Sequence, residues 1–367
     1  MIVADDRIPF LRGVFEPYAE VEYLKGSAIT PADVARADAL VVRTRTRCDA
    51  ALLSGSSVKF VATATIGYDH INAAELEKLG IAWRSAPGCN AASVAQYLAT
   101  VLTGFGLPLE GRTLGVVGVG NVGKLAVKVG EALGMKVLLN DPPRAEAEGE
   151  AGFVSLEEVA READFVTLHV PLVTGGKHPT VGLLDDRFFS LVKPGACIVN
   201  AARGEAAVGS ALKAALKSGK VACAAVDVWE NEPEIDRELL SLCRFATPHI
   251  AGYSTDGKAN GTTMAVRATA EFFSIDALKS FLALPPPPAN DELIRAREDD
   301  SEEAELHRIL CHTFDLHQVD MDLRNDPGSF EQLRGNAPLR REPFAYQVSG
   351  GSASLRRKLA ALGFVMA

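Results

Sequence analysis

A glycine-rich segment at residues 113–123 constrains the fold more than any other part of this sequence. It begins with the apolar pattern of a buried strand and continues as G-x-G-x-x-G, whose glycines are Gly118, Gly120 and Gly123. In a dinucleotide site the first glycine permits a tight turn, and the second lets the backbone approach a pyrophosphate. The third lets the following helix pack against the strand. An apolar helical pattern does follow, so the order of strand, loop and helix predicts a dinucleotide site.

Further residues fit this interpretation. The first helical residues, Asn121 and Val122, would offer unpaired N–H groups to phosphates. The next strand pattern ends at Asp141, where a carboxylate can accept hydrogen bonds from both ribose hydroxyls. Asp141 favours NAD over NADP because it would repel a 2′-phosphate, although Arg144 lies close by in the sequence. A glycine-rich turn in another doubly wound protein, such as a methyltransferase, is the competing interpretation.

Short strand and helix patterns alternate over residues 1–90 and again after the glycine loop. This alternation predicts an α/β protein with two doubly wound parallel-sheet domains. We expect a flavodoxin-like substrate-binding domain at 1–90 with 257–284, and a Rossmann NAD-binding domain at 91–256. The substrate domain is discontinuous because a helical stretch at about 260–281 should return the chain to it.

Four consecutive prolines after Leu284 cannot continue a helix and predict an extended connector. Beyond them the composition changes and shorter helical patterns are separated by polar loops. We expect residues 285–367 to form a small α+β domain. It shows no recognisable chemistry, which favours a role in interaction.

Three polar residues follow strand patterns that should belong to one parallel sheet. They are Arg203, Glu232 and His249. The carboxyl ends of such strands meet at one edge of the sheet, beside the glycine loop. A histidine can take the hydroxyl proton during alcohol oxidation, and a carboxylate on its other nitrogen would stabilise the imidazolium. A guanidinium can bind a substrate carboxylate. Each residue alone is more often structural, but together they predict hydride transfer.

On these residues the sequence resembles the NAD-dependent D-2-hydroxyacid dehydrogenase superfamily. Within it, the sequence is similar to a branch whose substrate is 4-phospho-D-erythronate. The closer similarity rests on 62–70, 86–90, 140–143 and 249–258. The resemblance implies Arg203, Glu232 and His249 as catalytic residues and a homodimer formed through the C-terminal domain. It also implies NAD contacts from Asp141, Ala201, Arg203, Asp227 and Gly252, and substrate contacts from Thr44, Thr65 and Tyr253.

The resemblance implies oxidation at C2 to 2-oxo-3-hydroxy-4-phosphobutanoate, in pyridoxal 5′-phosphate synthesis. A substrate phosphate needs cations, and Arg43 and Arg45 follow a strand pattern in the first domain. With Arg47 they would share one face if the segment were extended. A solvated charge cluster is an equally good interpretation. Phosphoglycerate dehydrogenase, another D-2-hydroxyacid dehydrogenase and a non-catalytic NAD-sensing protein all stay open at this point.

The composition limits the classes of partner that this protein could bind. The net charge is −9 with no long basic run, which argues against nucleic acid or an anionic membrane. No apolar run approaches the roughly 18 residues of a membrane span. The 6 cysteines form no C-x-x-C pair and show no spacing that suggests a metal. Together with an N-terminus that enters a strand pattern directly, they predict reduced thiols in a cytoplasmic protein.

Overall fold

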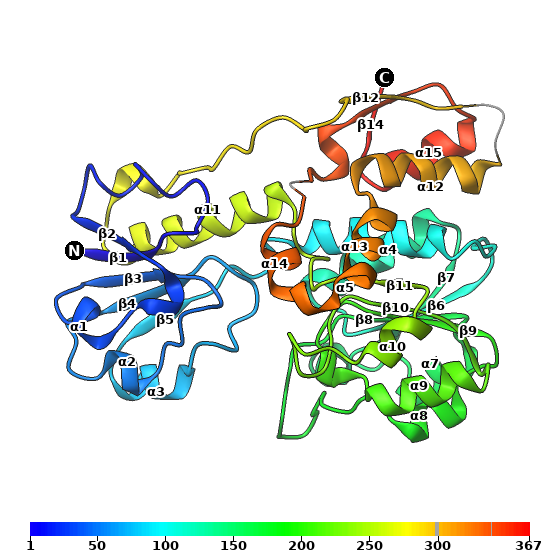
Figure 1. The fold of residues 1–367 in the computed structure, drawn as a ribbon, viewed down its shortest axis with the longest axis horizontal. Coiled ribbons are helices and arrows are strands. Elements are labelled where there is room, and N and C mark those ends of the chain that lie inside the picture. The colour runs from blue at the N-terminus through cyan, green and yellow to red at the C-terminus, as the bar shows by residue number, and fades with distance from the viewer. Residues whose placement is uncertain (298–300, 339) are drawn as a thin grey trace. The chain divides into compact units, whose positions relative to one another are not determined.

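The computed structural model describes residues 1–297, 301–338 and 340–367. The chain divides into two compact units, each built on a parallel sheet (Figure 1). The first unit contains Met1–Asn90 and Ser254–Pro286, and the second contains Ala91–Tyr253 and Pro287–Ala367. The second unit therefore includes the C-terminal segment, whose expected role in dimerisation stays a prediction.

The first unit contains a five-stranded parallel sheet in the order β2-β1-β3-β4-β5, which is the flavodoxin-like order that the sequence predicted. Its strands are β1 (Ile2–Asp5), β2 (Val21–Leu24), β3 (Ala39–Val42), β4 (Phe60–Thr63) and β5 (Ala82–Arg84). Its helices are α1 (Pro31–Val34), α2 (Ala50–Leu53), α3 (Ala73–Lys78) and α11 (Thr255–Phe272), with short 3₁₀ turns at Gly26–Ala28 and Asp276–Leu278.

Alternation of side chains along β3 gives this sheet two buried faces. Leu40 and Val42 pack in the same apolar cluster as residues of α2 and α3. Ala39 and Val41 pack in the opposite cluster with Val266 of α11, which lies along that face (Figure 1). The strand is therefore apolar throughout, as expected for a parallel strand covered on both sides.

Helix α11 begins and ends earlier than the stretch predicted at 260–281. Ser254 accepts a hydrogen bond from the backbone N–H of Gly257, which caps the helix at that point. The helix ends at Phe272, and Ser274 has a φ of 57°, which is incompatible with further helix. Residues Ser254–Pro286, which include this helix, belong to the first unit.

The second unit contains a six-stranded parallel sheet in the order β11-β10-β9-β8-β6-β7. A single bridge between Leu139 and Phe153 adds one residue pair beyond β7. Counting that bridge as a strand gives the 3-2-1-4-5-6 order of dinucleotide-binding sheets, with β11 added as a seventh strand at the far edge. The strands are β6 (Thr113–Val117), β7 (Lys136–Asn140), β8 (Phe165–Leu168), β9 (Ala196–Asn200), β10 (Val221–Val226) and β11 (Phe245–Ala246).

Helices cover both faces of this sheet, which confirms the predicted doubly wound fold class (Figure 1). One face packs against α4 (Ala91–Gly104) and α5 (Asn121–Ala132). The other packs against α7 (Leu156–Glu162), α8 (Asp186–Leu191), α9 (Gly209–Lys217) and α10 (Arg237–Leu242). A further helix, α6 (Pro142–Glu148), and a 3₁₀ turn at Gly204–Ala206 follow β7 and β9.

The C-terminal segment has a small parallel sheet of its own, in the order β12-β13-β14. Leu306 and Ile309 of α12 share one core cluster with Leu98 and Leu102 of α4, so this segment packs directly on the nucleotide-binding part. Its elements are β12 (Leu293–Arg295), α12 (Glu302–Thr313), α13 (Leu316–Asn325), α14 (Phe330–Gly335), β13 (Gln347–Ser349), α15 (Ala353–Ala361) and β14 (Val365–Met366), with 3₁₀ turns at Pro327–Ser329 and Pro343–Ala345.

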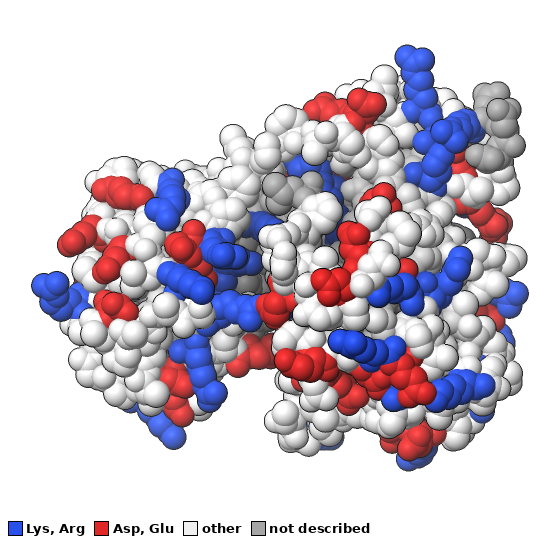
Figure 2. Space-filling view, viewed as in Figure 1, with Lys and Arg blue, Asp and Glu red and all other residues white. Residues whose placement is uncertain are grey.

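Basic and acidic side chains are interspersed on the face of the molecule drawn in Figure 2. This face therefore presents no broad field of a single sign, in keeping with the argument against a polyanionic partner. Within the residues that the structure describes, no helix combines the length and apolarity needed to cross a membrane.

Candidate active site

A row of paired residues runs across the second sheet where its strands end. Val117 pairs with Leu168, Leu168 with Asn200, Asn200 with Val226, and Val226 with Ala246. The strands are parallel, so the segments that follow this row leave from one edge of the sheet. These segments carry the glycine loop and the three residues that the sequence assigned to catalysis: Arg203, Glu232 and His249.

The glycine loop fits the dinucleotide interpretation. Gly118 has a φ of +87°, and a Cβ there would lie 2.8 Å from the backbone of His169. A Cβ on Gly123 would lie 2.0 Å from the carbonyl oxygen of Gly118. A Cβ on Gly120 would meet nothing within 4 Å. The first and third glycines are thus required by the protein itself, whereas the second leaves open space before Asn121, where α5 begins and a phosphate would lie.

Asp141 joins the second strand of the motif to the glycine loop. Its side chain accepts hydrogen bonds from the backbone N–H groups of Val119 at 2.8 Å and Arg144 at 3.1 Å. An ionised carboxylate has about four acceptor positions, so capacity for ribose hydroxyls is left. Arg144 donates to the Val119 carbonyl at 2.7 Å and forms an ion pair with Glu148 at 2.6 Å. Its guanidinium is therefore engaged by protein groups, which favours NAD over NADP.

His249 and Glu232 form the predicted pair. Nδ1 of His249 lies 2.7 Å from Oε2 of Glu232, while Oε1 accepts from the backbone N–H of Trp229 at 2.9 Å. The side chains are 29% and 17% exposed. Burial tends to raise the pKa of Glu232, but the hydrogen bond and charge of His249, with the Trp229 N–H and Arg334, lower it overall. The ring is thus held through Nδ1, and Nε2 points away from the carboxylate.

Asp227 organises the segment that carries His249. It is 1% exposed. It accepts three hydrogen bonds, from the Thr247 hydroxyl at 2.6 Å and the N–H groups of Ile250 at 2.7 Å and Ala251 at 2.9 Å. His249 itself has a φ of 56°, an unusual conformation for a residue with a side chain. A buried carboxylate that satisfies three donors therefore holds the histidine segment in shape.

A buried tyrosine extends this network. The hydroxyl of Tyr97, on α4, lies 3.0 Å from the Thr247 hydroxyl oxygen. Since Thr247 donates its proton to Asp227, Tyr97 is the donor in that contact. Burial raises the pKa of Tyr97 well above its usual value, so the phenol stays protonated. The sequence analysis missed this residue, because a tyrosine in an apolar helix looks like ordinary core.

Arg203 is positioned by the end of β9. The side chain of Asn200 donates to the Arg203 carbonyl at 3.0 Å and accepts from the Ala202 N–H at 3.1 Å. A Cβ on Gly204 would lie 2.1 Å from the backbone of Trp229, so the turn after Arg203 packs against the segment that leads to Glu232. The predicted cofactor contact Ala201 is half-buried in this turn.

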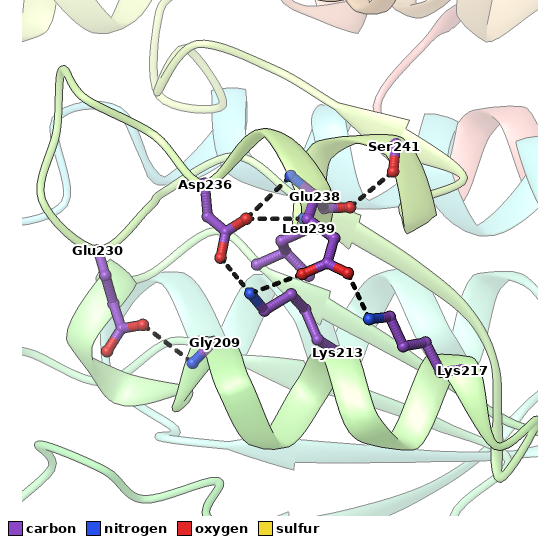
Figure 3. A network of polar contacts seen from close by, with 8 residues as sticks. All are labelled: Gly209, Lys213, Lys217, Glu230, Asp236, Glu238, Leu239 and Ser241. Atoms are coloured by element: carbon purple, nitrogen blue, oxygen red, sulfur yellow. Dashed lines mark hydrogen bonds and ion pairs between the residues drawn. The ribbon is translucent and has the colours of Figure 1, made fainter.

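The segment from β10 to α10 is anchored on both sides of Glu232. Glu230 accepts a hydrogen bond from the N–H of Gly209, at the start of α9, at 2.9 Å. Asp236 caps α10 and forms an ion pair with Lys213 of α9 at 2.6 Å. Figure 3 shows this network, in which Glu238 also pairs with Lys213. The loop that bears Glu232 is therefore fixed to two helices.

Arg334 is a second residue that the sequence analysis missed. It comes from α14 in the C-terminal segment, and its Nη1 lies 3.9 Å from Oε2 of Glu232. Its guanidinium carbon also lies 5.7 Å from the ring centroid of Tyr253, a predicted substrate contact next to Gly252. Nothing in the local sequence indicates this role, because only the tertiary fold brings α14 to the end of β10.

The predicted substrate residues of the first unit follow β3 and β4. Thr65 lies 2.7 Å, hydroxyl to hydroxyl, from Thr63, and Thr44 is exposed. The segment 43–47 forms a turn rather than an extended strand, so the condition under which Arg43, Arg45 and Arg47 would share one face is not met. The N–H of residue 46 donates to the carbonyl of residue 43 at 3.4 Å, which closes the turn.

The arginines of that turn have different surroundings. Nη1 of Arg43 donates to the Arg7 carbonyl at 3.2 Å, and Arg47 forms an ion pair with Asp49 at 2.7 Å. Arg45 is exposed at the tip of the turn, next to Thr44. The charge of Arg47 is therefore balanced by Asp49.

Comparison with known proteins defines the class of this fold and site. Residues 92–251 match the family model for the NAD-binding domain of D-isomer specific 2-hydroxyacid dehydrogenases. The fold is similar to a D-lactate dehydrogenase from Aquifex aeolicus, with a TM-score of 0.61, 24% identity and coverage of 78% of this chain and 100% of that chain. A 3-phosphoglycerate dehydrogenase from Entamoeba histolytica gives a TM-score of 0.64 and 24% identity, over 77% of this chain and 98% of that chain.

Sequence relatives narrow the class. A Bacteroides fragilis protein named erythronate-4-phosphate dehydrogenase is 47% identical over 343 residues, which cover 92% of this chain and 96% of that protein. A protein of the same name from Escherichia coli is 39% identical over 342 residues, with coverage of 91% and 90%. The chain belongs to the erythronate-4-phosphate dehydrogenase family, within the NAD-dependent D-2-hydroxyacid dehydrogenases.

Proposed function

We propose that this protein oxidises 4-phospho-D-erythronate at C2 to 2-oxo-3-hydroxy-4-phosphobutanoate, as a step in pyridoxal 5′-phosphate synthesis. The observation that carries the chemistry is the 2.7 Å contact between His249 and Glu232 at the edge of the nucleotide-binding sheet. The substrate is supported by the names of relatives that match this chain over nearly its full length.

His249 acts as the base in this reaction. Its Nε2 would take the proton of the C2 hydroxyl, and NAD, when bound, would supply the acceptor for the hydride on the same carbon. Glu232 holds the ring through Nδ1 and stabilises the imidazolium that forms. Trp229 keeps the carboxylate in place through its backbone N–H. His249 therefore removes the proton, and Glu232, on a neighbouring segment, stabilises the charge that forms on the ring.

Arg203 binds the substrate carboxylate and polarises the oxygen on C2. A planar guanidinium presents paired donors that match a carboxylate, which orients the 2-hydroxyacid toward His249. The hydrogen bonds of Asn200 fix the backbone on either side of Ala202 and so set the direction from which Arg203 extends.

The cofactor would lie along the edge of the second sheet. Its pyrophosphate would meet the glycine loop and the N–H groups of Asn121 and Val122, and its ribose would meet Asp141. Contacts with Ala201, Asp227 and Gly252 follow from the family resemblance. The three hydrogen bonds of Asp227 support a positioning role for its carboxylate, in addition to any contact with NAD.

Thr44, Thr65 and Tyr253 bind the body of the substrate in this proposal, and Arg43 or Arg45 binds its phosphate. The turn at residues 43–47 supports this assignment because it exposes Thr44 and Arg45 together. We also propose that the protein is a cytoplasmic homodimer formed through residues 285–367.

The test is NADH formation with 4-phospho-D-erythronate and 3-phospho-D-glycerate in parallel, with a 2-oxo acid added in a second series to reoxidise bound NADH. Turnover of the erythronate phosphate that disappears in His249→Ala supports both the substrate and the base. Preference for phosphoglycerate would contradict the proposed substrate but would leave the proposed mechanism of hydride transfer unchanged. Absence of turnover with either acid by protein that binds NAD would overturn the enzymatic proposal in favour of NAD sensing.

A further inference from the structure

A cluster of soft and borderline metal ligands lies in the C-terminal segment, away from the residues assigned to catalysis. Within residues 1–297, 301–338 and 340–367, His307, Cys311 and His317 form the one group of this kind whose ligand atoms all lie within 4.8 Å of one another. His307 and Cys311 are one helical turn apart on α12, and His317 is at the start of α13. We propose that these three residues bind a divalent transition metal ion, with Zn²⁺ as the best match.

The distances between the ligand atoms already approach those of a tetrahedral site. Nε2 of His307 lies 3.1 Å from Nε2 of His317 and 3.4 Å from Sγ of Cys311. Zinc bonds of about 2.0–2.1 Å to nitrogen and 2.3 Å to sulfur place two tetrahedral ligands about 3.4 Å apart for two nitrogens and about 3.6 Å for nitrogen and sulfur. Small side-chain movements would therefore complete three of the four coordination positions.

The hydrogen bonds of α4 prepare His307 as a ligand. The Thr103 hydroxyl donates its proton toward the carbonyls of Ala99 and Thr100, at 2.9 and 3.1 Å. The Thr103 oxygen must therefore accept from Nδ1–H of His307, which lies 3.0 Å away. This network assigns the proton to Nδ1 and leaves the Nε2 lone pair directed at the other two ligands. Such support of the second ring nitrogen is the usual arrangement behind a metal-binding histidine.

The backbone and a neighbouring ring hold the two histidines close together. A Cβ on Gly104 would lie 2.9 Å from Cε1 of His307, so the glycine permits this approach of α12 to α4. The ring of His317 packs edge-on against Phe245, with centroids 5.5 Å apart, and its exposed side leaves a fourth position for water. Cys311 would lose its proton and bind as a thiolate. The protein ligands would then be two imidazoles and one sulfur, a set that suits Zn²⁺.

A metal ion at this site would link two helices. A metal held by His307 and Cys311 on α12 and by His317 on α13 closes the short connection between these helices. Because a metal that binds the folded state stabilises it, the thermal midpoint of the protein should rise with free Zn²⁺. This role is independent of hydride transfer, so the inference does not rest on the proposed function.

The test uses the full chain after treatment with a chelator. Zn²⁺ binding is measured by calorimetry and by metal analysis after dialysis, for the parent, Cys311→Ser and His317→Gln. Cys223→Ser and His178→Gln serve as matched controls because each removes a half-buried thiol or imidazole elsewhere in the chain. Far-UV circular dichroism of each metal-free variant separates loss of the site from loss of the fold.

We expect one Zn²⁺ per parent chain and per control chain, and at least about tenfold weaker binding in both ligand variants. Thr103→Val should weaken binding by about 10–100-fold because it removes the acceptor behind His307. Co²⁺ should give a thiolate charge-transfer band in the parent that Cys311→Ser lacks. The proposal is overturned by a folded parent that binds no Zn²⁺, or by folded Cys311→Ser or His317→Gln variants that bind it as the parent does.

Discussion

Two segments that follow strands, one in each unit, are held in different ways. The segment Thr247–Ala251 is fixed by Asp227, which accepts three hydrogen bonds and is 1% exposed. The segment 43–47 is a surface turn, anchored through the buried Thr46 hydroxyl, which donates to the Gly26 carbonyl at 2.9 Å. The first segment thus has a buried hydrogen-bond network and the second has exposed cations. We infer that the first serves proton transfer and the second serves binding.

The largest effect should come from His249→Ala. Removal of a positioned general base lowers kcat by about 10²–10⁴-fold, whereas KM for the phosphorylated acid should change little. Steady-state kinetics with NAD and 4-phospho-D-erythronate measure both parameters, and His178→Ala is the control for loss of an imidazole. A variant with parental kcat would show that another group takes the proton.

Glu232→Gln should have a smaller effect on the same step. The amide keeps the hydrogen bond from Trp229 but removes the charge that stabilises the imidazolium, so kcat should fall by roughly 10–100-fold. Full retention of kcat would reduce Glu232 to a structural role and weaken the contrast between the two segments.

Glu232→Gln should also change how the free energy of unfolding depends on pH in acid. The pKa of Glu232 in the folded protein lies below its ordinary value of 4.5. Its interaction with His249 therefore contributes stability above pH 4.5 and loses it as the pH falls through the lower, folded pKa. Below pH 4.5 the free energy of unfolding should fall less steeply in Glu232→Gln than in the parent, as measured by denaturant titration.

Arg45→Gln tests the binding segment. Loss of a charged hydrogen bond to phosphate costs about 1.5–3 kcal/mol, so KM should rise about tenfold or more while kcat changes little. Arg47→Gln is the matched control because it removes an exposed guanidinium from the same turn. Equal KM values for Arg45→Gln and the parent would show that Arg45 does not bind the phosphate. In that case Arg43→Gln would have to raise KM.

The sequence predicted best what depends on short spacings. The glycines of the nucleotide loop are dictated by local backbone geometry, and Glu232 and His249 come six and three residues after the ends of β10 and β11. The sequence left open whether residues 43–47 are extended, because the buried contact of Thr46 with Gly26 gives no signal in the local pattern. Tyr97 and Arg334 gave no signal because their partners lie 150 and 102 residues away in the sequence. His307 and Cys311 had helical spacing, but only the fold brings in His317.

Arg334→Gln should give the smallest effect, and it tests whether the C-terminal segment supports the catalytic pair. The contact with Glu232 spans 3.9 Å, which is too long for a hydrogen bond, so we expect a contribution of about 1 kcal/mol at most and a decrease in kcat of about fivefold or less. Arg334→Lys should recover part of kcat because it retains the charge, and Arg356→Gln controls for charge loss in the same segment. Purely structural packing by Arg334 would instead lower the thermal midpoint equally in both variants and leave kcat unchanged. A selective decrease in kcat would extend the ion pair of Glu232 and His249 to α14, which lies outside the matched NAD-binding domain.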